Sequence, residues 1–203
     1  MAEKELKIIL LGESGVGKTS IILRYYKDLF DPNLHSTLGS TFITKKLERD
    51  NITYKLNIWD TTGQEKYHSV TKLFTQGADI VILVYAINNI ESFQKLDYWY
   101  KSIKDNCKEN IIICIVGNKY DLSINVDNII SEEEVEKFAK EKNAIFKLVS
   151  AKVDKKGIDS LFDELMNEYI GKASLKTSDY KEEKSVKIVY KKDKKKEKKR
   201  GCC

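Results

Sequence analysis

The sequence predicts an α/β domain with a six-stranded, mostly parallel sheet and helices on both faces, followed by a flexible basic tail. Two patterns favour this fold. Short apolar runs of strand length alternate with amphipathic segments of helical period, and a glycine-rich turn joins the first run to the first helix. A chain of 203 residues is long enough for one such domain. We place the domain at residues 1–172 and the tail at residues 173–203.

The expected elements follow one another in a regular order. Runs rich in apolar and β-branched residues predict strands at residues 6–11, 41–47, 52–59, 80–87, 111–116 and 144–149. Amphipathic segments predict helices after residue 19, from about 90 to 107, after the capping box Ser131–Glu134, and around residues 158–166. The polar residues 48–51 between the second and third strands predict a hairpin. Ligands of such sheets bind at the carboxyl ends of the strands.

The segment Gly12–Thr19 matches the phosphate-binding pattern G-x-x-x-x-G-K-[ST] at every fixed position. It lies between a predicted strand and a predicted helix, which points backbone N–H groups and a helix N-terminus at one anion. We expect Lys18 to reach the β- and γ-phosphates of a nucleotide and the Thr19 hydroxyl to ligate Mg²⁺. The predicted phosphate-binding residues are Ser14, Gly15, Val16, Gly17, Lys18, Thr19 and Ser20.

A second motif selects the base. Asn118–Asp121 follows a buried strand directly, and the Asp121 carboxylate there accepts hydrogen bonds from the N1–H and N2–H₂ edge of guanine. Adenine offers no such donors, so the motif disfavours an ATPase or a phosphate-loop kinase. Asn118 is expected to bind the base and tie the loops together, and the Lys119 stem to pack on the purine. Ser150, Ala151 and Lys152 follow another strand and supply a further backbone N–H.

Charge and cysteine content limit the other functions. The net charge of +5 divides into +7 for residues 176–203 and −2 for residues 1–175, so the domain itself gives no signal for nucleic-acid binding. No apolar run approaches the ~20 residues that span a bilayer, and the N-terminus lacks the apolar core of a signal peptide. Cys107 and Cys114 are expected to be reduced structural thiols of a cytosolic protein.

Five parts of the chain resemble, in order and spacing, the five signature segments of Ras-superfamily small GTPases over residues 6–170. They are Gly12–Thr19, Thr37, Trp59–Glu65, Asn118–Asp121 and Ser150–Lys152. Within that superfamily, the chain resembles the Rab branch in Trp59 before the aspartate, in the run Gly39–Phe42 and in the terminal Cys202-Cys203. Residues 65–69 resemble its endosomal members.

The resemblance implies a GTP/GDP switch that hydrolyses GTP slowly by itself and regulates vesicle traffic. Thr19 and Thr37 would ligate Mg²⁺, with Asp60 acting on it mainly through water. The Gly63 N–H would meet the γ-phosphate, Gln64 would orient the attacking water, and Phe30 would stack edge-on against guanine. Residues 34–41 and 61–76 would change with the nucleotide state. Phe42, Trp59 and Phe74 match the aromatic cluster that Rab proteins present to effectors.

The resemblance also implies partners. The three arginines, Arg24, Arg49 and Arg200, lie in no segment that resembles an internal arginine finger, so a GTPase-activating protein must supply the acceleration. Nucleotide exchange factors, effectors and an escort protein or GDP dissociation inhibitor are the further partners expected. The double cysteine resembles the Rab signal for two geranylgeranyl groups, and two chains anchor stably where one does not. We expect a lipid-anchored protein on the cytoplasmic face of an endosomal or vesicle membrane, cycling with the cytosol, its basic tail against the lipid.

The chain departs from the family at Thr62, where an alanine is usual, at Ala86, where aspartate is common, and at Thr75-Gln76, where Tyr-Arg is usual. Thr62 keeps open an alternative function, a scaffold that holds GTP and hydrolyses it slowly or not at all. A signalling GTPase of the Ras or Rho type is a second alternative.

Overall fold

The computed structural model describes residues 2–37, 39–63, 74–107, 110–123 and 129–174. Two compact units are distinguished, residues 1–165 and residues 166–203. Within the described residues, no helix has both the length and the apolar character needed to cross a bilayer. The boundary that we expect between domain and tail, after residue 172, remains a prediction.

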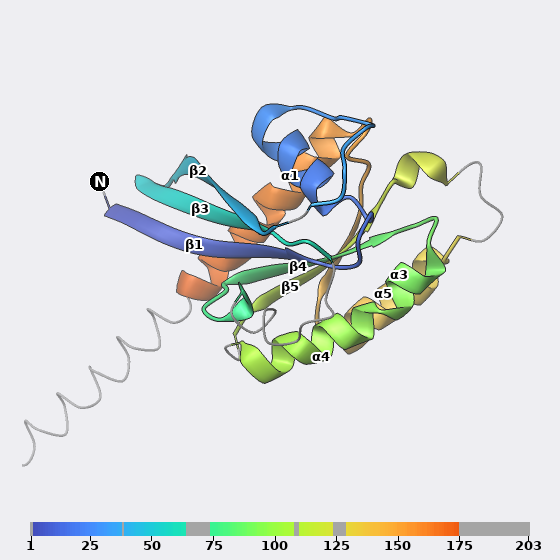
Figure 1. Ribbon diagram of the computed structural model, residues 1–203. Helices are drawn as coiled ribbons and strands as arrows, with labels where there is room; N and C mark the ends of the chain where they lie inside the picture. Colours follow the sequence, from blue (N-terminus) through green and yellow to red (C-terminus); the bar gives the residue numbers. More distant parts are fainter. Residues whose placement is uncertain (1, 38, 64–73, 108–109, 124–128, 175–203) are drawn as a thin grey trace, which may run out of the picture. The chain divides into compact units, whose positions relative to one another are not determined.

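The six expected strands are present and form a single sheet (Figure 1). They are β1 (Ala2–Leu11), β2 (Thr41–Arg49), β3 (Ile52–Asp60), β4 (Ile80–Ala86), β5 (Ile112–Asn118) and β6 (Ile145–Leu148). Their order is β2-β3-β1-β4-β5-β6, and only β2 runs antiparallel to its neighbour. The predicted fold class is therefore confirmed. β1 is longer than predicted, because its polar first residues pair with β3 from Ala2↔Ile52 onward.

The helices are α1 (Lys18–Lys27), α3 (Ile90–Gln94), α4 (Leu96–Asn106), the 3₁₀ turn η1 (Tyr120–Leu122) and α5 (Glu132–Glu141). Residues 155–174 are also helical. The Ser131 side chain accepts a hydrogen bond from the Glu134 N–H, so the predicted cap of α5 is present. The single helix expected from 90 to 107 is divided at Lys95, which lies between α3 and α4 with φ −76° and ψ −7°, although its N–H still bonds the carbonyl of Glu91 as in an α-helix.

Helices cover both faces of the sheet. Side chains alternate between the two faces along each strand, so each face has apolar groups to bury against these helices. Figure 1 shows α3, α4 and α5 on one face and α1 with the helical residues 155–165 on the other. Ile9 and Leu11 of β1 belong to the core cluster that contains Trp99 of α4 and Val135 of α5. On the opposite face the ring of Tyr25 stacks on that of Phe162, with centroids 3.7 Å apart. β4 and β5 are buried along their whole length.

The sheet topology places the loops. After β1 the chain continues to the β3 side of the sheet, and after β4 it continues to the β5 side, so connections diverge between the adjacent strands β1 and β4. A crevice forms at such a point, outside the carboxyl ends of the strands. The predicted hairpin between β2 and β3 lies at the other end, where Asp50 and Asn51 both adopt positive φ, as a tight two-residue turn requires.

Candidate guanine-nucleotide site

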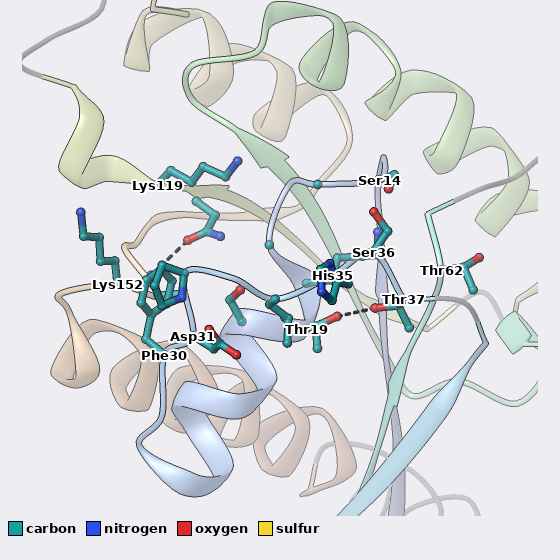
Figure 2. A pocket seen from close by; sticks show the side chains of 18 of the residues that line it. Ser14, Thr19, Phe30, Asp31, His35, Ser36, Thr37, Thr62, Lys119 and Lys152 are labelled. Carbon is teal, nitrogen blue, oxygen red and sulfur yellow. Dashed lines mark hydrogen bonds between the residues drawn. The ribbon is translucent and has the colours of Figure 1, made fainter.

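A cavity of about 350 Å³ lies at the carboxyl ends of the central strands. The described residues that line it include most of the predicted nucleotide-binding residues: Ser14, Gly15, Gly17, Lys18, Thr19, Ser20, Phe30, Thr37, Asn118, Lys119, Asp121, Ala151 and Lys152. In Figure 2, Phe30 and Lys152 lie towards one end of this cavity and Thr37 and Thr62 towards the other. Segments that are more than a hundred residues apart in the chain thus form one pocket.

The loop between β1 and α1 needs glycine at two positions for steric reasons. A Cβ on Gly12 would lie 2.1 Å from the carbonyl oxygen of Val84 in β4, and one on Gly17 would lie 2.3 Å from the Asn118 side-chain nitrogen. Both residues also have positive φ, at 142° and 97°. The loop is therefore pressed against β4 and β5, and its shape is set by these contacts.

Lys18 is the buried cation of this loop, with 4% of its surface exposed. Its Nζ donates hydrogen bonds to the carbonyl oxygens of Gly12, at 2.6 Å, and Glu13, at 2.9 Å. Gly63 closes over the same place, since a Cβ there would lie 2.5 Å from Lys18 Nζ and 2.6 Å from the Ser14 nitrogen. A positive charge and two backbone segments therefore meet at the phosphate end of the cavity.

Thr19, Thr37 and Asp60 come together beside Lys18. The Thr19 hydroxyl donates to Asp60 Oδ2 at 2.7 Å and lies 2.8 Å from the Thr37 hydroxyl oxygen. The second carboxylate oxygen, Asp60 Oδ1, is buried and has no hydrogen-bond partner among the described residues. Burial raises the pKa of Asp60, while the Thr19 hydrogen bond and the charge of Lys18 oppose that rise. A buried carboxylate oxygen without a hydrogen bond, in a side chain whose other oxygen bonds Thr19, fits a hard cation such as Mg²⁺.

The base end of the cavity is fixed by Asn118, which is 2% exposed. Its Nδ2 donates to the carbonyl oxygen of Val16 at 2.9 Å, and its Oδ1 accepts from the Ala151 N–H at 3.1 Å. Asn118 thus ties the phosphate loop to the loop after β6. The Ser150 hydroxyl donates to Asp121 Oδ1 at 2.6 Å and orients that carboxylate. Burial lowers the pKa of Lys119, whose stem borders the cavity.

Comparison with known proteins gives the family. The model of the Ras family matches residues 7–171. The chain belongs to the Ras family. It is 40% identical to human Ras-related protein Rab-22A over 165 residues, covering 81% of this chain and 84% of that protein. It is 40% identical to Ras-related protein Rab-18 of Caenorhabditis elegans over 166 residues, covering 81% and 80%. It is 45% identical to Ras-related protein Rab-31 of Rattus norvegicus over 123 residues, covering 61% of this chain and 63% of that protein.

These relatives place the chain in the Rab branch. It is a small GTPase that binds GTP and GDP, hydrolyses GTP and regulates vesicle trafficking, in association with intracellular membranes. The two alternatives, a non-hydrolysing scaffold and a Ras- or Rho-type signalling protein, are not favoured.

The three aromatic residues expected to face Rab effectors form a continuous cluster outside the cavity. Phe42 of β2 and Trp59 of β3 are cross-strand partners whose rings stack with centroids 5.1 Å apart. The Trp59 and Phe74 rings are tilted, with centroids 5.9 Å apart. Phe42 is 57% exposed, which leaves an aromatic face open to a partner.

Several predicted residues lie outside the described part of the Rab chain. These are Gln64, expected to orient water, residues 65–69, and the terminal Cys202 and Cys203. Other cavity residues were given no individual role from the sequence: Asp31, Pro32, Leu34, His35, Ser36, Thr61 and Leu122. For residues 34–36 and Thr61 the signal was present, since they fall in segments 34–41 and 61–76, which are expected to change with the nucleotide. Thr61 is fixed by a hydrogen bond of 2.8 Å to the Leu10 carbonyl, which no local pattern indicates.

Gly17→Ala tests whether the steric fit of the phosphate loop matters. The new Cβ displaces the Asn118 amide and breaks its link to Val16, so we expect nucleotide affinity to fall at least about tenfold. Gly77→Ala is the matched control, because Gly77 also has a positive φ, 74°, but its Cβ would meet nothing within 4 Å. Calorimetric titration of the nucleotide-free proteins with GDP measures both. Equal affinities of the two variants would contradict the steric argument.

Proposed function

We propose that the cavity holds one guanine nucleotide with Mg²⁺, phosphates at the loop of residues 12–19 and base between residues 118–121 and 150–152. One observation carries this proposal: Asn118 joins the two loops through its single amide, so both ends belong to one cavity. Exchange of GDP for GTP would then act on the residues that reach the γ-phosphate, which are Thr37 and Gly63 in this assignment.

The phosphate end has the charges that hydrolysis requires. Lys18 would turn from the loop carbonyls to the phosphate oxygens, and the N–H groups of Ser14, Gly15, Val16, Gly17 and Ser20 line the same end in our proposal. Thr19, Thr37 and Asp60 would hold Mg²⁺, which supplies positive charge to the phosphate oxygens when bound. The Gly63 N–H would donate to the γ-phosphate, and Gln64 would orient the water that attacks it. Charge that develops on the phosphate would thereby be met by the cations and N–H groups of this end of the cavity.

The base end discriminates guanine by its hydrogen-bond pattern. Asp121 accepts from the Ser150 hydroxyl through one oxygen, which holds the carboxylate in a fixed orientation. It would accept the N1–H and N2–H₂ donors of guanine, and adenine would leave the charge unpaired. Phe30 would cover the base edge-on, and the stems of Lys119 and Lys152 would lie along its faces.

Hydrolysis needs a partner for speed. Both arginines of the described residues are engaged elsewhere: Arg24 with backbone carbonyls beside the base loop and Arg49 with Asp163. We propose that a GTPase-activating protein provides a cation at the phosphate end, and that an exchange factor and effectors act on the same protein at other stages. Phe42, Trp59 and Phe74 would form the effector contact.

The terminal residues are proposed to anchor the protein. Two geranylgeranyl groups on Cys202 and Cys203, with the lysine-rich residues before them against anionic lipid, would hold it on an endosomal or vesicle membrane. An escort protein or GDP dissociation inhibitor would cover the lipids in the cytosol. The likeness of residues 65–69 to endosomal members supports this compartment.

Asp121→Asn tests the base assignment. The variant should bind GTP at least about a hundredfold more weakly, because the NH₂ of the new amide faces the N2–H₂ donor of guanine, and should gain affinity for xanthosine triphosphate, whose C2 carbonyl accepts from that NH₂. Competition binding with both nucleotides measures the change. Unchanged GTP affinity would refute the assignment.

Thr62→Ala tests the departure beside the γ-phosphate. Thr62 lines the phosphate end of the cavity, and its branched side chain adds bulk in the turn that must close on the γ-phosphate (Figure 2). We expect hydrolysis to be faster in the variant, by a factor on the order of 2–10, because water and Gln64 reach the in-line arrangement more often. Single-turnover rates with Mg²⁺ compare the two proteins. Equal rates, with no label from the γ-phosphate retained on the chain, would show that Thr62 does not affect hydrolysis.

Replacing Cys202 and Cys203 together by serine tests the anchor. In cells the double variant should move from the membrane fraction to the cytosol, and each single variant should be held less firmly than the parent protein. Fractionation against a compartment marker measures the shift. Continued membrane residence of the double variant would place the anchor elsewhere.

A further inference from the structure

Arg24 has a contact set that its place in the chain does not suggest. It lies in the last turn of α1, outside the residues that line the cavity, and its side chain is 15% exposed. Its Nε donates to the carbonyl oxygen of Ala151 at 2.8 Å, and its Nη2 donates to that of Lys152 at 2.9 Å. One guanidinium therefore binds two successive carbonyls of the loop after β6, 127 and 128 residues away in sequence.

These two bonds determine which way the loop's N–H groups point. In a trans peptide the carbonyl and the following N–H point in opposite directions, and the described residues contain no cis bond. Because the Ala151 carbonyl faces Arg24 behind the cavity wall, the Lys152 N–H faces the other way, from a residue that lines the cavity. The Ala151 and Val153 N–H groups bond Asn118 Oδ1 and Ser150 Oγ, whereas no hydrogen bond of the Lys152 N–H is found in the described part of the chain.

Arg24 also holds the opposite wall of the base end. Its Nη1 donates to the Asp28 carbonyl oxygen at 3.2 Å and to Asp28 Oδ1 at 2.8 Å. Asp28 ends α1 in the left-handed conformation, with φ 55°, and the chain runs from there to Phe30 in the cavity wall. The planar guanidinium thus joins the two segments that would enclose the base, as a fork of fixed donors can and a single ammonium cannot.

We propose that Arg24 is a positioning residue for guanine: by holding the Ala151 and Lys152 carbonyls it keeps the Lys152 N–H directed at the O6 oxygen of the base. The inference rests on the proposed placement of guanine between residues 118–121 and 150–152. It assigns Arg24 no contact with the nucleotide. Its consequence is that Arg24 controls how long guanine nucleotides stay bound, and that its influence depends on the atom at position 6 of the purine.

The test is the release rate of GDP and of 6-thio-GDP from the full chain. Sulfur accepts hydrogen bonds weakly, so the analogue reports the O6 contact. Arg24→Met keeps the aliphatic stem and the helix propensity but removes every donor. Arg49→Met is the matched control, because it removes an arginine–carboxylate bond of 2.6 Å, to Asp163, by a residue that does not line the cavity. A thermal melt of each variant verifies folding, and Arg24→Lys replaces Arg24→Met if the latter does not fold.

We expect Arg24→Met to release GDP about tenfold faster and 6-thio-GDP at most about threefold faster, since part of the lost contact is already absent with sulfur. Arg24→Lys should give a smaller change with the same preference, and Arg49→Met should stay within about twofold of the parent for both. Equal acceleration of the two nucleotides, or none, would overturn the proposal and leave Arg24 a purely structural residue. If the parent protein itself released GDP and 6-thio-GDP at the same rate, no hydrogen bond to O6 would exist. That result would refute the proposed placement of the base, whatever the Arg24 variants show.

Discussion

The buried amide of Asn118 is the constraint on which the site depends. It is the last residue of β5, and it bonds the Val16 carbonyl of the phosphate loop and the Ala151 N–H of the base loop at once. The absence of a side chain on Gly17 follows from it, because a Cβ there would occupy the place of its amide nitrogen. Leaving either buried partner without its hydrogen bond costs about 1–3 kcal/mol, so the two loops are held in one arrangement.

The other walls of the cavity are fixed in the same way, each by a polar contact to a neighbouring segment. Thr61 bonds the Leu10 carbonyl of β1, and Lys95, in the turn between α3 and α4, forms a salt bridge of 2.8 Å with Glu13 of the phosphate loop. Arg24 plays this part for the base loop. A parallel sheet brings loop starts to a common edge, and these contacts then decide the direction in which each loop leaves that edge. The cavity is therefore a property of the links between loops as much as of the motifs within them.

The sequence predicts well what local chemistry determines. Gly12–Thr19 and Asn118–Asp121 are short motifs that follow buried strands, and strand, motif and helix can all be recognised within about twenty residues. The sequence predicts poorly those features that depend on contacts between distant segments. The polar start of β1 becomes strand because it pairs with β3, Lys95 divides a helix that its apolar face alone would continue, and Arg24 looks like an ordinary basic residue near a helix end. Its partners are 127 and 128 residues away, and no spacing rule connects them.

One amide couples the phosphate loop to the base loop, and the rate of GDP release from Asn118→Ala tests this coupling. Both loops lose their shared partner, so release should be about a hundredfold faster than in the parent protein. Asn57→Ala is the matched control, since Asn57 also joins two side chains, Thr44 and Glu5, but on the sheet away from the cavity. We expect that of these two variants only Asn118→Ala releases GDP faster than the parent protein. A release rate of Asn118→Ala within about twofold of the parent would contradict it.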